Sequence, residues 1–162
     1  LPQDQDNYSV LTLEELVESA WNSIRPLAEA REVELDFAQT ESGLMMGDQP
    51  CLHRAVLNLL DNALRYSPPG AAVDVQIHPS GGWWQLSIRD HGPGLSESDL
   101  DKMFQRFYRG DPSRSRSARS GSGLGLAIVQ QIVFNHGGRV EARNHPEGGT
   151  CMELTLPKAL PE

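Results

Sequence analysis

Two asparagines and an arginine stand at helical spacing in the polar segment Asn58–Tyr66. Residues four apart share one face of an α-helix, so Asn58 and Asn62 would project together, with Arg65 on a neighbouring edge. Amide oxygens are acceptable ligands for Mg²⁺, which takes only one or two ligands from protein and the rest from phosphates and water. The pattern indicates a magnesium–phosphate site, although on its own it is more often a solvent-exposed polar helix face.

A carboxylate followed by two glycines occurs in the segment Asp90-His91-Gly92-Pro93-Gly94. An ionised carboxylate only accepts hydrogen bonds, so Asp90 could recognise an exocyclic amine such as that of adenine. Gly92 and Gly94 would let the backbone approach a flat ring closely. The alternative interpretation is an Asx turn that ends a strand.

A glycine-rich stretch, Gly121-Ser122-Gly123-Leu124-Gly125-Leu126, precedes an apolar run. Such loops expose backbone N–H groups at the positive end of a helix and bind phosphate. No GK[ST] follows, and no strand precedes the stretch, so it is neither a Walker loop nor a dinucleotide fingerprint. The alternative is a flexible linker.

Three aromatics and two arginines are concentrated in Phe104-Gln105-Arg106-Phe107-Tyr108-Arg109. The aromatics could anchor a lid, and the Arg109 guanidinium could then reach a phosphate. A small satellite core is an equally good interpretation, and the two are compatible. Gly148-Gly149-Thr150, near the end of the chain, is typical of a hairpin turn.

The elements that would position these residues follow from apolar periodicity and capping signals. Thr12 predicts the start of a helix that Pro26 should kink or end, and Asp48 predicts the start of a second helix over Gln49–Tyr66. Further helical patterns cover residues 98–108 and 124–136. Strand patterns cover residues 33–37, 43–47, 73–77, 83–90, 139–144 and 151–156.

This order of helices and strands predicts an α+β fold, with one mixed sheet and helices packed on one face. The length of 162 residues suits a single domain. Residues 1–11 are polar and are predicted to be a linker, followed by a domain over residues 12–159 and a tail over 160–162. A chain beginning at Leu1 is expected to be part of a longer protein.

The composition excludes several classes of protein. The net charge of −8 argues against nucleic acid as the main partner. No apolar stretch is long enough for a membrane helix, and two cysteines make neither a disulfide scaffold nor a zinc site. Six of the 14 basic residues lie within residues 102–119, which could serve a small anion or form a solvated loop.

Taken in this order and spacing, the five segments resemble the ATP-binding catalytic domain of bacterial sensor histidine kinases. That domain shares its fold with DNA gyrase, heat-shock chaperone ATPases and MutL. The resemblance implies a two-layer α/β sandwich, the Bergerat fold, with a mostly antiparallel sheet, about three helices and a flexible ATP lid over about residues 95–122. It also implies ATP and Mg²⁺ as cofactors.

The resemblance further implies a role for each motif residue. Asn62, with Asn58 beside it, would hold Mg²⁺. Asp90 would accept the adenine amine, and Arg109, with Asn58, would be catalytic and stabilise the γ-phosphoryl group. Further nucleotide contacts are expected from Arg65, Tyr66, Gly92, Gly94, Phe107, Gly121, Gly123, Leu124, Gly125, Leu126 and Thr150.

By the same resemblance, the phosphoryl group passes to a histidine on a separate dimerisation domain. None of the five histidines here stands in the family's acceptor motif, so that domain is expected to precede Leu1. The expected partners are this domain and a response regulator, with no nucleic acid and no direct membrane contact. The implied context is the cytoplasmic part of a homodimeric bacterial inner-membrane protein, whereas this chain alone is expected to be monomeric.

Two alternatives stay open at this stage. The chain could be a non-catalytic nucleotide-binding signalling module, or another kinase of the superfamily such as the anti-sigma-factor type. Superfamily members that hydrolyse ATP place a glutamate general base at the position of Asn58. Because an amide cannot take up a proton there, we expect slow hydrolysis.

Overall fold

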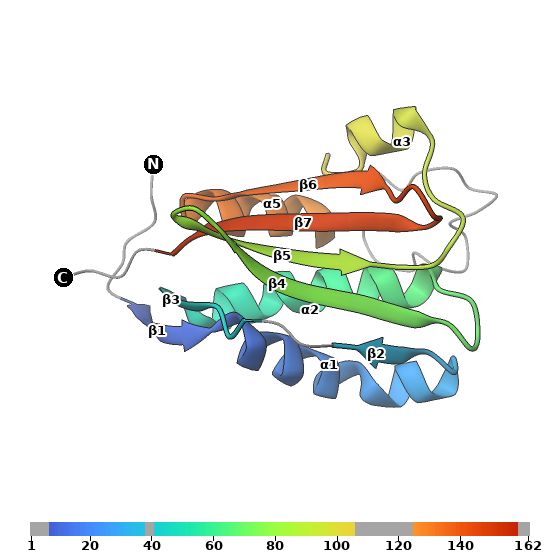
Figure 1. Cartoon of the computed structure of the whole chain (residues 1–162), viewed down its shortest axis with the longest axis horizontal. Helices are drawn as coiled ribbons and strands as arrows, with labels where there is room; N and C mark the ends of the chain where they lie inside the picture. Colours follow the sequence, from blue (N-terminus) through green and yellow to red (C-terminus); the bar gives the residue numbers. More distant parts are fainter. Residues whose placement is uncertain (1–6, 38–40, 106–124, 159–162) are drawn as a thin grey trace.

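The computed structural model describes residues 7–37, 41–105 and 125–158 (Figure 1). In these ranges three long helices and two sheets account for most of the chain. The elements in chain order are β1 (Tyr8–Thr12), α1 (Leu13–Ala30), β2 (Glu34–Asp36), β3 (Leu44–Asp48), α2 (Gln49–Tyr66), β4 (Ala72–Ser80), β5 (Trp83–Arg89), α3 (Glu97–Lys102), α5 (Gly125–Asn135), β6 (Arg139–Asn144) and β7 (Thr150–Pro157).

The larger sheet has five strands in the order β2-β4-β5-β7-β6. The β2–β4 pair is parallel and the other pairs are antiparallel. In Figure 1, α2 and α5 lie behind this sheet, and α1 runs along α2. The predicted α+β fold, with a mixed, mostly antiparallel sheet and a helical layer, is therefore confirmed.

Local capping explains where the two longest helices begin. The Thr12 hydroxyl accepts a hydrogen bond from the Glu15 amide at 3.1 Å, and the Asp48 carboxylate accepts one from the Cys51 amide at 3.2 Å. Each bond satisfies a backbone donor that the first helical turn leaves without a partner. Both predicted caps are confirmed, and the predicted bounds of α2 match the observed helix.

The core lies between the helical layer and the inner face of the large sheet. One apolar face of α2 packs into this core. The central strands contribute every second side chain, because successive side chains of a strand point to opposite faces of the sheet. The fully buried side chains include Leu52, Leu59, Leu60, Leu64, Ile77, Leu86, Ile88, Leu154 and Leu156. Because this face of α2 is buried, the adjoining half-buried face, which carries Asn58 and Asn62, is fixed in orientation.

The linker prediction is wrong where it covers Tyr8–Leu11. These residues form β1, which pairs antiparallel with β3, so the fold contains a second, two-stranded sheet in addition to the predicted one. Leu11 enters the core at 7% exposure, and the Tyr8 ring stacks on the His136 ring with centroids 4.9 Å apart. The polar sequence hides this strand because its stabilising partners are distant in the chain.

Two predicted helix bounds also change. Of the two predicted effects of Pro26, the end of the helix is wrong, since α1 continues to Ala30. The lost backbone donor falls on an exposed position, and Ala28 beyond it is buried in the core. The helix predicted over residues 98–108 is observed as α3, which starts one residue earlier at Glu97, after its Ser96 cap, and ends at Lys102. Residues 106–108 lie outside the described ranges.

Candidate functional site

The amide face of α2 lies beside the start of α5. The Asn58 Nδ2 donates to the Gly125 carbonyl oxygen at 3.3 Å, although the two residues are 67 positions apart. Asn58 and Asn62 are half-buried, and within the described residues Asn62 makes no side-chain hydrogen bond. The fold therefore brings the predicted metal-ligand face to the helix that follows the glycine-rich segment.

Arg65 is held on the same helix by an acidic neighbour. Its Nε lies 3.1 Å from each carboxylate oxygen of Asp61, one turn earlier. The two side chains are 27% and 36% exposed, and an ion pair this exposed contributes at most about 1 kcal/mol. A phosphate could therefore take over the guanidinium at little cost. Arg31 also donates to the Arg65 carbonyl oxygen at 2.9 Å, tying the ends of α1 and α2 together.

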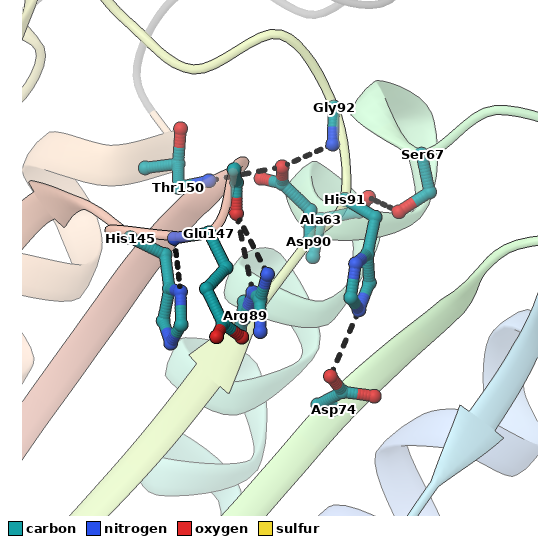
Figure 2. Close-up of polar contacts among 11 residues, drawn as sticks. Ala63, Ser67, Asp74, Arg89, Asp90, His91, Gly92, His145, Glu147 and Thr150 are labelled. Carbon is teal, nitrogen blue, oxygen red and sulfur yellow. Dashed lines mark hydrogen bonds and ion pairs between the residues drawn. The ribbon is translucent and has the colours of Figure 1, made fainter.

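Asp90 follows β5 directly and is 4% exposed. Figure 2 shows its Oδ1 accepting from two backbone amides, that of Gly92 at 2.9 Å and that of Thr150 at 3.1 Å. The Asp90 amide in turn donates to the Thr150 carbonyl oxygen at 3.0 Å. These two bonds fix the orientation of the carboxylate, which only accepts hydrogen bonds when it is ionised.

Glycines are required around this carboxylate for two different reasons. A Cβ at Gly92 would collide with the Tyr66 carbonyl oxygen, and a Cβ at Gly149 would collide with the Asp90 carbonyl oxygen. Gly149 also adopts φ +82°, a conformation that side chains disfavour. At Gly92 the backbone therefore lies close to the last residue of α2. From the sequence we expected a close approach to a purine ring and did not anticipate this contact within the protein.

The sequence prediction missed several residues that hold this region together. The Arg89 guanidinium donates to the Gly148 carbonyl oxygen at 3.2 and 3.0 Å, and the His91 Nε2 lies 2.8 Å from the Asp74 carboxylate (Figure 2). Asn144 bonds the backbone of Leu95. The glycines of residues 90–94 and 148–150 predict turns in both segments. No sequence pattern predicts which residues of the two segments bond each other.

A cysteine next to Thr150 contributes no reactive group. Cys151 is 4% exposed, and burial raises the pKa of its thiol, a rise that the nearby Arg143 only partly offsets. Thiolates are the nucleophilic form of cysteine, so this side chain stays protonated at neutral pH. The chemistry of the region must come from the carboxylate and the amides.

The remaining predicted site residues divide into three groups. In the first, the Thr150 amide donates to Asp90, the Tyr66 carbonyl oxygen lies against Gly92, Gly94 lies against Asn144, and Gly125 begins α5. In the second group, Leu126 of α5 is 5% exposed and packs in the hydrophobic core. Phe107, Arg109, Gly121, Gly123 and Leu124 lie outside the described residues.

The donor set has the composition that a magnesium–nucleotide site needs. No group of three or more histidine, cysteine, aspartate or glutamate side chains could hold a metal within the ranges described. Mg²⁺ bound through one or two amide oxygens requires phosphate and water for its other ligands. The amide face of α2 therefore fits a metal that arrives with a phosphate chain. Within the same ranges, no helix has the length and apolarity to cross a bilayer.

Known proteins similar to this chain identify its family. Residues 47–160 match the family described as histidine kinase-, DNA gyrase B- and HSP90-like ATPase. The chain belongs to this ATPase family.

Among the relatives, the sensor protein SphS of Synechococcus elongatus is 42% identical over 97% of this chain and 40% of its own length. The sensor protein KdpD of Escherichia coli is 40% identical over 91% of the chain and 16% of its own length. The chain thus spans less than half of either relative.

Solved structures similar to this chain are histidine kinases. A mycobacterial sensor histidine kinase, MprB, is 33% identical and superimposes with a TM-score of 0.80, covering 93% of this chain and 97% of that one. The catalytic domain of the histidine kinase ThkA, at 21% identity, shares the fold with a TM-score of 0.80 over 93% and 95% of the two chains. The resemblance to sensor histidine kinases is therefore confirmed.

Proposed function

We propose that the chain binds Mg-ATP and donates the γ-phosphoryl group to a histidine on a separate dimerisation domain. The observation that carries the proposal is the pairing of two subsites within this ATPase fold. Asp90, oriented by the Thr150 and Gly92 amides, lies at one end. The Asn58–Gly125 contact joins the amide face of α2 to the start of α5 at the other.

Each subsite has a defined task in this proposal. Asp90 accepts from the adenine amine, and Asn62, with Asn58, supplies amide oxygens to the metal. When bound, Mg²⁺ neutralises part of the charge on the phosphate oxygens. Arg65 leaves Asp61 to contact phosphate, and Arg109 stabilises the γ-phosphoryl group. The other motif residues that we propose to line the nucleotide are Tyr66, Gly92, Gly94, Phe107, Gly121, Gly123, Leu124, Gly125 and Thr150, whereas Leu126 is buried in the core.

The proposed phosphoryl transfer needs no covalent intermediate with this chain. A bond forms between an imidazole nitrogen and the γ-phosphorus while the bond to the β–γ bridging oxygen breaks, and ADP leaves. Such transfer depends on positioning and electrostatic stabilisation. Because the Asn58 amide cannot act as a base toward water, hydrolysis is slow and the γ-phosphoryl group waits for the imidazole.

The partners and the cellular context belong to the same proposal. The solved ThkA complex contains a response regulator, and we propose that a cognate regulator receives the phosphoryl group here too. The acceptor domain belongs to the same parent protein, which we propose to be a homodimer in a bacterial inner membrane. This chain is then a cytoplasmic part of that protein and is monomeric by itself.

The test combines this chain with a separately produced acceptor domain and ATP labelled at the γ-phosphate. We expect acid-labile label on the acceptor histidine, and none when that histidine is replaced by glutamine. Calorimetry with Mg-ADP measures binding in parallel. Binding without label transfer would overturn the kinase role in favour of a non-catalytic nucleotide module. The absence of binding would overturn the whole proposal.

A further inference from the structure

The loop Asp90–Leu95, which leads from β5 to α3, is fastened at both ends to one hairpin. At its first end, Asp90 and Thr150 exchange two hydrogen bonds. At its last end, the Leu95 amide donates to the Asn144 Oδ1 at 2.8 Å, and the Asn144 Nδ2 donates to the Leu95 carbonyl oxygen at 2.7 Å. Figure 1 shows the chain rising past the end of β6 to reach α3.

The two fastening residues are partners across the hairpin. Asn144 ends β6, Thr150 begins β7, and their Cα atoms are paired in register. One cross-strand pair at the end of the large sheet therefore holds both ends of the loop. Both ends of the loop are therefore anchored at the same end of the large sheet.

The chemistry of the Asn144 side chain matches its task. A primary amide presents one carbonyl oxygen and N–H donors, so it pairs with the Leu95 backbone as another strand would. Aspartate has the same shape but only accepts when ionised. Gly94 makes room for the amide, since a Cβ there would lie 3.0 Å from the Asn144 Oδ1, and its φ of +81° turns the loop toward β6.

We propose that Asn144 is a positioning residue for the nucleotide base. By fixing Leu95, it keeps the loop that carries Asp90, Gly92 and Gly94 in the shape that receives adenine. This inference rests on the proposed function, because the base is the ligand assigned to Asp90. It adds a residue outside the motifs, on a strand that contributes no other predicted contact.

The first measurement concerns the contact itself and needs no nucleotide. In Asn144→Ala, hydrogen exchange of the Leu95 amide should become at least tenfold faster, because its acceptor is gone. The matched control is Asn22→Ala, which removes an exposed side-chain amide bonded to Arg25 on α1 and should leave Leu95 exchange unchanged. Unchanged exchange in Asn144→Ala would overturn the proposal.

The second measurement is affinity for Mg-ADP and for adenosine. Asn144→Ala should weaken both about five- to tenfold, because the loop meets the base, whereas Asn22→Ala should stay within twofold of the parent chain. Arg65→Ala, at the phosphate end, should weaken ADP alone. If Asn144 had a merely structural role, Asn144→Ala would lower the unfolding midpoint, but the folded variant would bind both ligands within twofold of the parent chain.

A second variant guards against misfolding of the first. Asn144→Asp keeps the acceptor for the Leu95 amide but loses the donor to its carbonyl oxygen, so at neutral pH it should bind ADP no better than Asn144→Ala. Parent-like affinity in either variant would overturn the positioning role. If the parent chain bound no nucleotide, the proposed function and this role would both fall, while Leu95 exchange would still report the contact.

Discussion

The two ends of the proposed nucleotide site are built very differently. At the base end, Asp90 is buried, two hydrogen bonds tie its carboxylate and backbone to Thr150 of the β6–β7 hairpin, and the Gly92 amide of its own loop donates a third. At the other end, within the described residues, the α2 amide face makes one long contact to Gly125, and Arg65 has an exposed partner on its own helix. The base end is preorganised, whereas the phosphate end is able to rearrange.

This difference suits a ligand with one constant part and one changing part. Adenine is the same before and after transfer, so a rigid receptor loses little entropy on binding it. The phosphate chain loses a group and its metal contacts change, so weak, replaceable contacts there are an advantage.

The largest expected effect breaks the base end directly. Asp90→Asn keeps the shape but places an amide where a charged acceptor stood, and hydrogen bonds to charged groups contribute about 1.5–3 kcal/mol. We expect Mg-ADP affinity to fall by roughly 10- to 100-fold, measured by calorimetry, with the circular dichroism spectrum unchanged. Parent-like affinity would contradict the role of Asp90.

A pair of neighbouring glycines tests how rigid the base end is. Gly148 and Gly149 both have positive φ, but only at Gly149 would a Cβ meet the protein, at the Asp90 carbonyl oxygen. Gly148→Ala should cost about 1–2 kcal/mol of backbone strain, and Gly149→Ala should lower the free energy of unfolding by at least about 3 kcal/mol. Urea denaturation measures both, and equal losses would show that the collision relaxes freely.

The phosphate end is tested through its metal dependence. Asn62→Ala removes one oxygen from a metal that takes only about one or two from protein. We expect Mg-ATP affinity to fall about tenfold, and we expect ATP affinity in the presence of a chelator to differ by less than twofold. A loss that persists without magnesium would assign Asn62 to the nucleotide and not to the metal.

The smallest effect concerns the two cysteine thiols and is measured as a function of pH. Burial raises the pKa of Cys151, beside Thr150, and of Cys51, near the start of α2. A folded-state pKa above the unfolded value gives stability that is fully present below the unfolded thiol pKa of about 8.5 and is lost as pH rises through the folded pKa.

The unfolding midpoint should therefore decline as pH rises above about 8.5. This decline should become shallower in Cys151→Ala, and less so in Cys51→Ala, because Cys51 is the more exposed of the two. Identical pH profiles for the parent chain and both variants would contradict the burial of the thiols.

Local patterns were sufficient for α2, because its caps, its apolar face and its amide face are all encoded within one continuous segment. The motifs also identified Asp90 and Thr150, but not that they bond each other across 60 positions. No sequence pattern predicted the hydrogen bonds between Asn144 and Leu95, since an asparagine at the end of a strand is usually only a turn residue. β1 was missed for a similar reason, because its strand character depends on β3.

The smaller sheet has a mechanical consequence. Register pairs Tyr8 with Asp48, the residue that starts α2, and the Asp48 amide also donates to the His136 ring, on which Tyr8 stacks. Displacing Tyr8 would therefore also disturb the residue that caps α2. The helix that carries Asn58 and Asn62 thus shares its first turn with the contacts of the smaller sheet.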